Sequence, residues 1–275
     1  MKKFSLIFLF LTLCFSAQTH RFIYEIHYKK DSAENLISKQ NYYLDINPDE
    51  SFYYARPFFI SDSILLKTGD MTFGGKMNDY IRVKSNSKDY EVFAFEGFDT
   101  FKIVENATQK WKISPETKML ANLKVQKAIT NWGGRNWEGW FAPEIPFQEG
   151  PYKFNGLPGL IVEISDDKNN YQFTLVKSEN IKETQILDFY KRFKGRAVEI
   201  PVLKYAKMKL ETYFTPVKPA HDGTIDITKS NFMTEDNLRI SSMEELKVYE
   251  DAFRKSLKKY NNPIELNKAV HYPND

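Results

Sequence analysis

The chain has one cysteine, four histidines and no apolar run long enough to span a bilayer, and each of these shortages excludes a class of protein. One cysteine forms no internal disulfide bond, and if Cys14 is removed with the N-terminal apolar run, a cysteine-ligated zinc site is excluded as well. The histidines do not stand at metal-ligand spacing from one another; they are His20, His27, His221 and His271. The sequence therefore predicts no metal site and no transmembrane helix.

The chain also has no strong excess of positive or negative charge, since it contains 39 basic and 36 acidic residues. We therefore expect no nucleic-acid partner. The Gly-x-Ser-x-Gly motif of serine hydrolases is absent, and Gly74-Gly75-Lys76 lacks the rest of a phosphate-binding loop. Residues 165–170 are rich in calcium-type ligands but are more simply explained as a hairpin turn. We therefore assign no catalytic residue and expect no cofactor.

The N-terminus has the layout of a secretory signal peptide. Two lysines precede an apolar stretch from Phe4 to Phe15, and small residues follow as far as Ala17. We predict that residues 1–17 are removed and that the protein is exported to the periplasm or the extracellular space. Lipid anchoring at Cys14 is disfavoured because the preceding Leu13 is not small.

Aromatic residues are abundant, at 15% of the chain, and they favour half-buried strands. Short alternating segments separated by turn residues follow one another from Arg21 to Ile181. Hairpin connections imply antiparallel pairing, and a sheet with so many strands curls or closes. We predict a mainly β domain over residues 18–200, either a curved antiparallel sheet or a partly open β-barrel.

The C-terminal region, residues 201–275, changes to helical spacing. Leu203–Phe214 forms one predicted helix. A second opens at Ser241-Ser242 with a capping-box pattern and carries an apolar stripe that includes Leu246 and Phe253. We expect these helices to pack against the sheet. The stripe is also compatible with binding a partner.

Four prolines lie between Ala142 and Gly159, which predicts a rigid lid or corner rather than a loose loop. Leu157-Pro158-Gly159-Leu160 fits a type II turn, with a positive φ at Gly159. The preceding Gly156 is expected to allow close backbone approach. Long ordered connections of this kind are often functional.

The stretch "GRNWEGWFAPEIPFQEGPYKFNGLPGLIVEI", residues 134–164, resembles the signature of the GLPGLI family, whose name is the motif at Gly156–Ile161. The resemblance implies an exported protein of Bacteroidetes without an established biochemical function. The family pattern often has a cysteine where this chain has Val125, so the resemblance implies no thiol role here.

Six residues of this stretch are the candidate ligand- or partner-binding residues: Arg135, Trp137, Trp140, Glu144, Phe154 and Leu157. Clustered tryptophans line apolar cavities or form interface hot spots, although cross-strand packing alone also accounts for them. A four-residue turn would bring Trp132 and Trp137 opposite each other. We expect Arg135 to pair with Glu144 or Glu163 and to pin the lid.

Three functions remain open. The first is a non-enzymatic envelope protein that binds an apolar small molecule, a lipid or an outer-membrane protein. The second is a hydrolase of envelope glycans or peptides that uses two of the carboxylates Glu138, Glu144, Glu149 and Glu163. The third is a structural accessory of an outer-membrane assembly. We favour the first and expect the protein not to be an enzyme.

Overall fold

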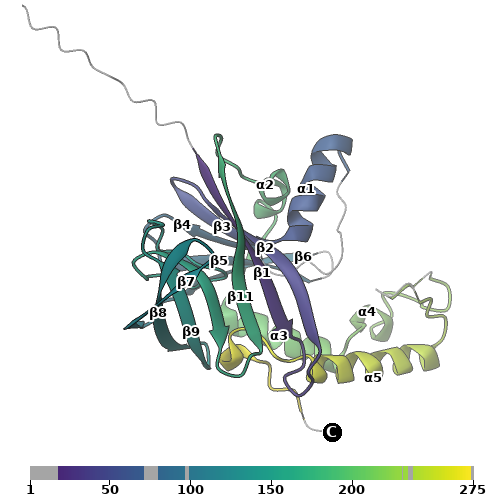
Figure 1. Cartoon of the computed structure of the whole chain (residues 1–275). Helices are drawn as coiled ribbons and strands as arrows, with labels where there is room; N and C mark the ends of the chain where they lie inside the picture. The colour runs from purple at the N-terminus through teal and green to yellow at the C-terminus, as the bar shows by residue number, and fades with distance from the viewer. Residues whose placement is uncertain (1–17, 71–79, 97–98, 231, 235–237, 274–275) are drawn as a thin grey trace, which may run out of the picture.

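The computed structural model describes residues 18–70, 80–96, 99–230, 232–234 and 238–273. The proposed signal peptide, Cys14 and Gly74–Lys76 lie outside these residues. Within the described residues, twelve strands form one sheet (Figure 1). Their order across it is β12 (Val198–Glu199), β6 (Asp99–Asn106), β5 (Asp89–Glu96), β4 (Tyr80–Lys84), β3 (Glu50–Ala55), β2 (Ile37–Ile46), β1 (Thr19–Lys29), β11 (Tyr171–Ile181), β10 (Leu160–Asp166), β9 (Arg135–Ala142), β8 (Leu123–Trp132) and β7 (Lys112–Leu120).

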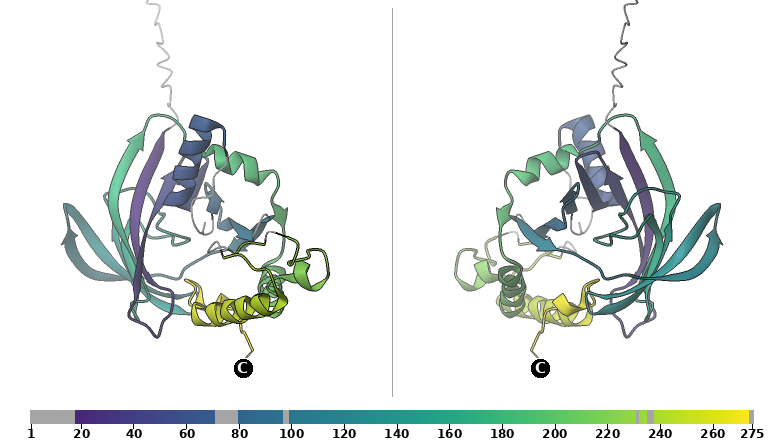
Figure 2. Two further views of the ribbon diagram at one scale, coloured as in Figure 1. Left: turned by 90° about the vertical axis from the view of Figure 1, so that its right-hand side faces the viewer. Right: turned by 90° about the vertical axis from the view of Figure 1, so that its left-hand side faces the viewer.

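The sheet is built from two series of hairpins joined at the centre. Strands β1 to β6 pair in chain order, as do β7 to β11, and β11 then returns to pair with β1. These pairs are antiparallel, and the two-residue β12 is parallel to β6. The edge strands β7 and β12 are not neighbours, so the sheet is open, and it curls into a deep arc (Figure 2). The predicted curved antiparallel sheet is therefore confirmed.

Helices lie in the upper and lower parts of the molecule as drawn in Figure 2. The two upper helices, α1 (Arg56–Thr68) and α2 (Asp188–Lys194), contact each other. The C-terminal set is α3 (Val202–Phe214), α4 (Lys218–His221), α5 (Met243–Lys259) and the 3₁₀ turn η1 (Leu266–Lys268). Of these, α3 contacts β6, and α5 packs on α3. The capping box is present, since the Glu245 amide donates to the Ser242 hydroxyl over 3.2 Å.

Helix α1 was not anticipated from the sequence. Its signals are Pro57 in its first turn and Gly69 after its end, where φ is +79°. Buried Asp62 ties it to α2 by accepting a hydrogen bond of 2.7 Å from the Phe189 amide. Burial raises the pKa of Asp62, and this hydrogen bond acts against the shift.

Alternate residues of β1 define two faces of the sheet. Arg21 points to the outer face, where its guanidinium lies 5.0 Å from the ring of Phe59 in α1. Arg21 also forms a buried pair with Asp45 at 2.6 Å. Tyr24 points to the inner face, where its hydroxyl donates to the Ile161 carbonyl over 2.7 Å.

Helices α1 and α2 cover the outer face over β2 to β5, where aromatic rings fill the space between helices and sheet. The rings of Tyr54, Tyr80 and Tyr190 stack in sequence, with centroids 5.2 Å apart at each step. Phe58 of α1 and Phe193 of α2 both meet Tyr80 edge-on. This packing explains why the aromatic content is high on strands that are buried on both faces.

Residues 143–159, the Pro/Gly segment, cover the inner face. Phe147 packs against Phe22, with ring centroids 5.6 Å apart, and Phe154 against Trp137 at 4.7 Å. Tyr152 meets Tyr53 edge-on. The segment is therefore part of the core and not a lid over an empty concavity.

The predicted type II turn at Leu157–Leu160 is wrong. The φ of Gly159 is +151°, whereas that turn needs a value near about +80°. The Leu160 amide donates to the Ile145 carbonyl over 3.1 Å instead of closing a turn. Close approach also occurs at a different glycine: a Cβ on Gly159 would lie 2.3 Å from the Ala142 carbonyl oxygen, whereas one on Gly156 would meet nothing within 4 Å.

We predict that Gly159→Ala lowers the free energy of unfolding by more than about 2 kcal/mol, because backbone must move to admit the methyl group. The matched control is Gly195→Ala, where φ is −72° and the added Cβ has open space. That variant should change stability by less than about 1 kcal/mol. Equal effects in urea denaturation would contradict the assigned role of Gly159.

Candidate functional site

The outer face over β7 to β10 carries a cluster of charged side chains around one tryptophan. It lies on the face opposite the Pro/Gly segment, whereas α1 and α2 pack over β2 to β5. Antiparallel sheets commonly leave one face to solvent, with polar residues at alternate positions. We call this cluster the Trp140 face and define it as Glu116, Lys118, Lys127, Glu138, Trp140 and Glu163.

Strand register brings these residues together. Trp140 of β9 pairs with Lys127 of β8 on one side and with Glu163 of β10 on the other. The ammonium of Lys118 lies 4.1 Å from the Trp140 ring centroid, and that of Lys127 lies 5.7 Å away. Trp140 is therefore only 6% exposed, although it is on the solvent side of the sheet.

Each lysine of the Trp140 face is paired with a carboxylate. Lys118 binds Glu163 at 2.7 Å, and Lys127 binds Glu138 at 2.8 Å. The hydrogen bond from Lys127 holds the pKa of Glu138 below its usual value. A glycosidase needs a general acid whose pKa is raised, so Glu138 does not have the property of that acid.

The other aromatic candidates lie on the inner face. Trp137, Phe154 and Leu157 are buried in the main core, on the opposite side of β9 from Trp140. The predicted Trp132–Trp137 pairing is wrong, because the turn holds only Gly133 and Gly134. Trp132 is opposite Arg135 in the register, and the Trp137 indole donates to the Trp132 carbonyl over 3.0 Å. The structure therefore does not bring the six candidates into one site.

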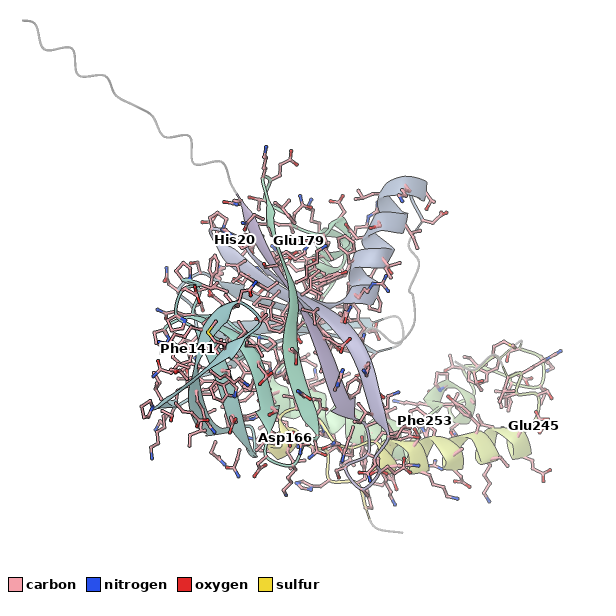
Figure 3. The ribbon with its side chains drawn as sticks, viewed as in Figure 1. His20, Phe141, Asp166, Glu179, Glu245 and Phe253 are labelled. Atoms are coloured by element: carbon pink, nitrogen blue, oxygen red, sulfur yellow. The ribbon has the colours of Figure 1, made fainter. Side chains whose placement is uncertain are left out.

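Arg135 does not pair with Glu144 or Glu163, and that expectation is wrong. Its guanidinium is buried and binds Asp166 at 3.1 Å, at the lower end of the β10–β11 hairpin in Figure 3. Glu144 is exposed, and its carboxylate accepts a hydrogen bond of 3.0 Å from the Lys124 amide. Glu163 forms its ion pair with Lys118 instead. Register explains the difference, since Asp166 is two pairs from Arg135 along the adjoining strands.

A small cavity remains between the Pro/Gly segment and the inner face of the sheet. Its volume is about 10 Å³, which is about the space that one water molecule needs. Glu149, Tyr53 and Tyr90 are among the residues that line it. The Tyr53 hydroxyl is buried and has no hydrogen-bond partner within the described part of the chain. Burial raises the pKa of the Glu149 carboxyl. Hydrogen bonds from the backbone amides of Glu149 and Gln148 partly oppose this shift.

Sequence reasoning missed Lys118 and Lys127, which hold the Trp140 face together. Both occupy alternating positions of ordinary strands, so nothing in their local sequence distinguishes them from other surface lysines. Among the described residues, no group of three or more histidine, cysteine, aspartate or glutamate side chains is placed to hold a metal ion. No helix in the described part of the chain is long and apolar enough to cross a membrane.

Comparison with known proteins supports the fold and the motif. A family model described as "Protein of unknown function (Porph_ging)" matches residues 133–163, which contain β9 and the Pro/Gly segment. No curated protein matches the chain. Two solved structures, "Structure of PNGF-II in C2 space group" and the same protein in P21, are similar, each with a TM-score of 0.51.

The similarity to PNGF-II is one of fold. Identities are 20% and 19%, over 70% of this chain. The aligned part makes up 32% and 33% of the two PNGF-II chains, so this chain corresponds to about a third of their length.

We predict that Glu149→Gln raises the thermal midpoint at pH 7 and leaves it unchanged at pH 4. Because the pKa of Glu149 is raised in the folded state, protonated Glu149 contributes fully to the free energy of unfolding at acid pH, and this contribution is lost as the pH rises through that pKa. Glutamine does not ionise, so the variant does not lose stability in this way. Exposed Glu144→Gln is the control for deleting one charge, and a lower midpoint for Glu149→Gln at pH 7 would contradict the prediction.

Proposed function

We propose that the protein is an exported cell-envelope protein of the GLPGLI type that acts as a non-enzymatic binding or accessory module for an envelope protein partner. The partner binds the Trp140 face. One observation carries this proposal: a large aromatic side chain lies among ion pairs on the part of the outer face that the helices leave uncovered.

The lysines that cover Trp140 are easily displaced. The side chains of Lys118 and Lys127 are 36% and 22% exposed, and cation–π contacts at such sites are worth about 0.5–1 kcal/mol. A tryptophan buried at the centre of an interface contributes about 2 kcal/mol or more. A partner that moves the lysine stems aside therefore gains more than it costs, and its own carboxylates can take over the lysine charges.

An apolar small molecule or lipid has less support as the ligand. Pockets for such ligands measure about 300–1,000 Å³. The cavity beside Glu149 measures about 10 Å³, because Phe154 and its neighbours fill the inner face.

The hydrolase alternative rests on the raised pKa of Glu149. It requires a second carboxylate, and none is among the residues that line that cavity. The third alternative, a structural accessory of an outer-membrane assembly, would use the same contacts without regulated binding, and in-cell crosslinking would support it.

We predict that Trp140→Ala reduces capture of the partner from solubilised envelopes by about tenfold or more, measured by crosslinking and quantitative mass spectrometry. The variant should stay folded and lose less stability than Trp137→Ala, for which about 3–5 kcal/mol is expected.

The control is Leu203→Ala, which removes an apolar side chain of α3 that is 84% exposed. Its capture profile should equal that of the wild type. If Trp140→Ala retains every interaction, or if it loses binding only in proportion to lost stability, the Trp140 face is not the binding surface.

A further inference from the structure

Residues 261–268 follow α5, contain no strand and end in the 3₁₀ turn η1; we call them the C-terminal strap. It runs along the lower ends of β9 and β11 (yellow in Figure 1), close to Asp166 in Figure 3. The side chains that hold it come from the β8–β9 hairpin, from the Pro/Gly segment and from β11.

Arg135 and Tyr171 bind the backbone of the strap. The Arg135 guanidinium donates to the carbonyls of Pro263 at 2.8 Å and Ile264 at 3.0 Å. The Tyr171 hydroxyl donates to the Asn262 carbonyl over 2.5 Å. Arg135 also donates to the Asn262 side chain at 2.5 Å. These contacts fix the backbone of residues 262–264 and select asparagine at one position.

A second group of side chains binds one acidic residue of the strap. Glu265 is 6% exposed and accepts hydrogen bonds from Lys153 at 2.6 Å and Tyr152 at 2.8 Å. Burial opposes ionisation of Glu265, but the charges of Lys153 and Lys268 keep its pKa below its usual value. Both lysines also contact Glu105. The Pro/Gly segment thus supplies a buried site for a carboxylate.

The backbone around this site is held in unusual conformations. Tyr152 has a φ of +57°, which is uncommon for a bulky residue and typical of ligand clamps. A Cβ on Gly134 would lie 3.0 Å from the Asn267 nitrogen, so this glycine lets the strap approach closely. The Asn267 amide donates to the Gly133 carbonyl over 3.2 Å.

Apolar contacts of the strap are few. Ile264 is half-buried, and Leu266 is 39% exposed. Polar contacts of this kind can be replaced by contacts with water or with another peptide. The strap is therefore attached in the way that a bound peptide is attached, by backbone hydrogen bonds and one buried acidic anchor.

We propose that the side chains that hold the strap form a peptide-binding site and that the strap is its resident ligand. The partner of this site is a segment of another protein with the pattern Asn-Pro-x-Glu, as in Asn262–Glu265. The partner segment replaces the strap at Arg135, Tyr152 and Lys153. The site is separate from the Trp140 face, so this inference goes beyond the proposed function and does not depend on it.

An exchange experiment tests the proposal. A protease site is inserted after Tyr260 in the full chain, the folded protein is cleaved, and a fluorescein-labelled peptide of residues 261–269 is added. We expect the labelled peptide to replace the cleaved strap, with a rise in anisotropy. A Glu265→Gln peptide should compete at least about tenfold less well. An Asn267→Ala peptide should compete like the wild type, because Asn267 contributes its backbone amide.

An uncleaved variant covers the case in which cleavage unfolds the chain. Full-length Glu265→Gln weakens the strap in place and should bind the labelled wild-type peptide, whereas the wild-type chain should not. The proposal is overturned if the cleaved chain stays folded without exchange and Glu265→Gln does not bind the peptide. It is also overturned if competition does not depend on the glutamate.

Discussion

An open sheet that curls this far has an apolar inner face, and the structure depends on the covering of that face by the chain's own Pro/Gly segment. The covering is held by the contact of Gly159 with the Ala142 carbonyl and by the hydrogen bond from Tyr24 to Ile161. Phe147 and Phe154 then fill the concavity. A residue larger than glycine at position 159 would push the segment away from β9. The glycine at position 159 is therefore a requirement of the core.

This arrangement determines where function is to be sought. Since the inner face is filled, Trp137, Phe154 and Leu157 act in packing, and their use as ligand contacts stays a prediction. Other side chains of residues 134–164 indicate two other surfaces where function is to be sought. Trp140 faces the uncovered outer surface, and Arg135, Tyr152 and Lys153 hold the C-terminal strap. The match to a family of unknown function spans all of these residues, at 133–163.

Period-two patterns in the sequence predicted the sheet and its antiparallel hairpins, because alternation is a local property, but they left a curved sheet and a partly open barrel both possible. They did not predict α1, whose apolar residues are interrupted by Ser61, Asp62 and Ser63. The register of the strands could not be predicted from the sequence either. A two-residue turn at Gly133-Gly134 decides that Trp132 is opposite Arg135, and it is register that sends Arg135 to Asp166. The strap contacts join residues that are far apart in the chain, from 91 positions for Tyr171 and Asn262 to 129 positions for Arg135 and Ile264, so no local signal marks them.

Native-state hydrogen exchange at the Pro/Gly segment tests most directly whether this segment is core. The amides of Gly156, Leu160 and Ile161 donate to carbonyls within the segment, at 2.7, 3.1 and 3.1 Å. We predict that they exchange only through the opening that also exposes β1 and β10, with the same free energy of opening. Exchange of these amides at a much lower free energy, independent of the strands, would show that the segment opens separately as a lid and would contradict the account.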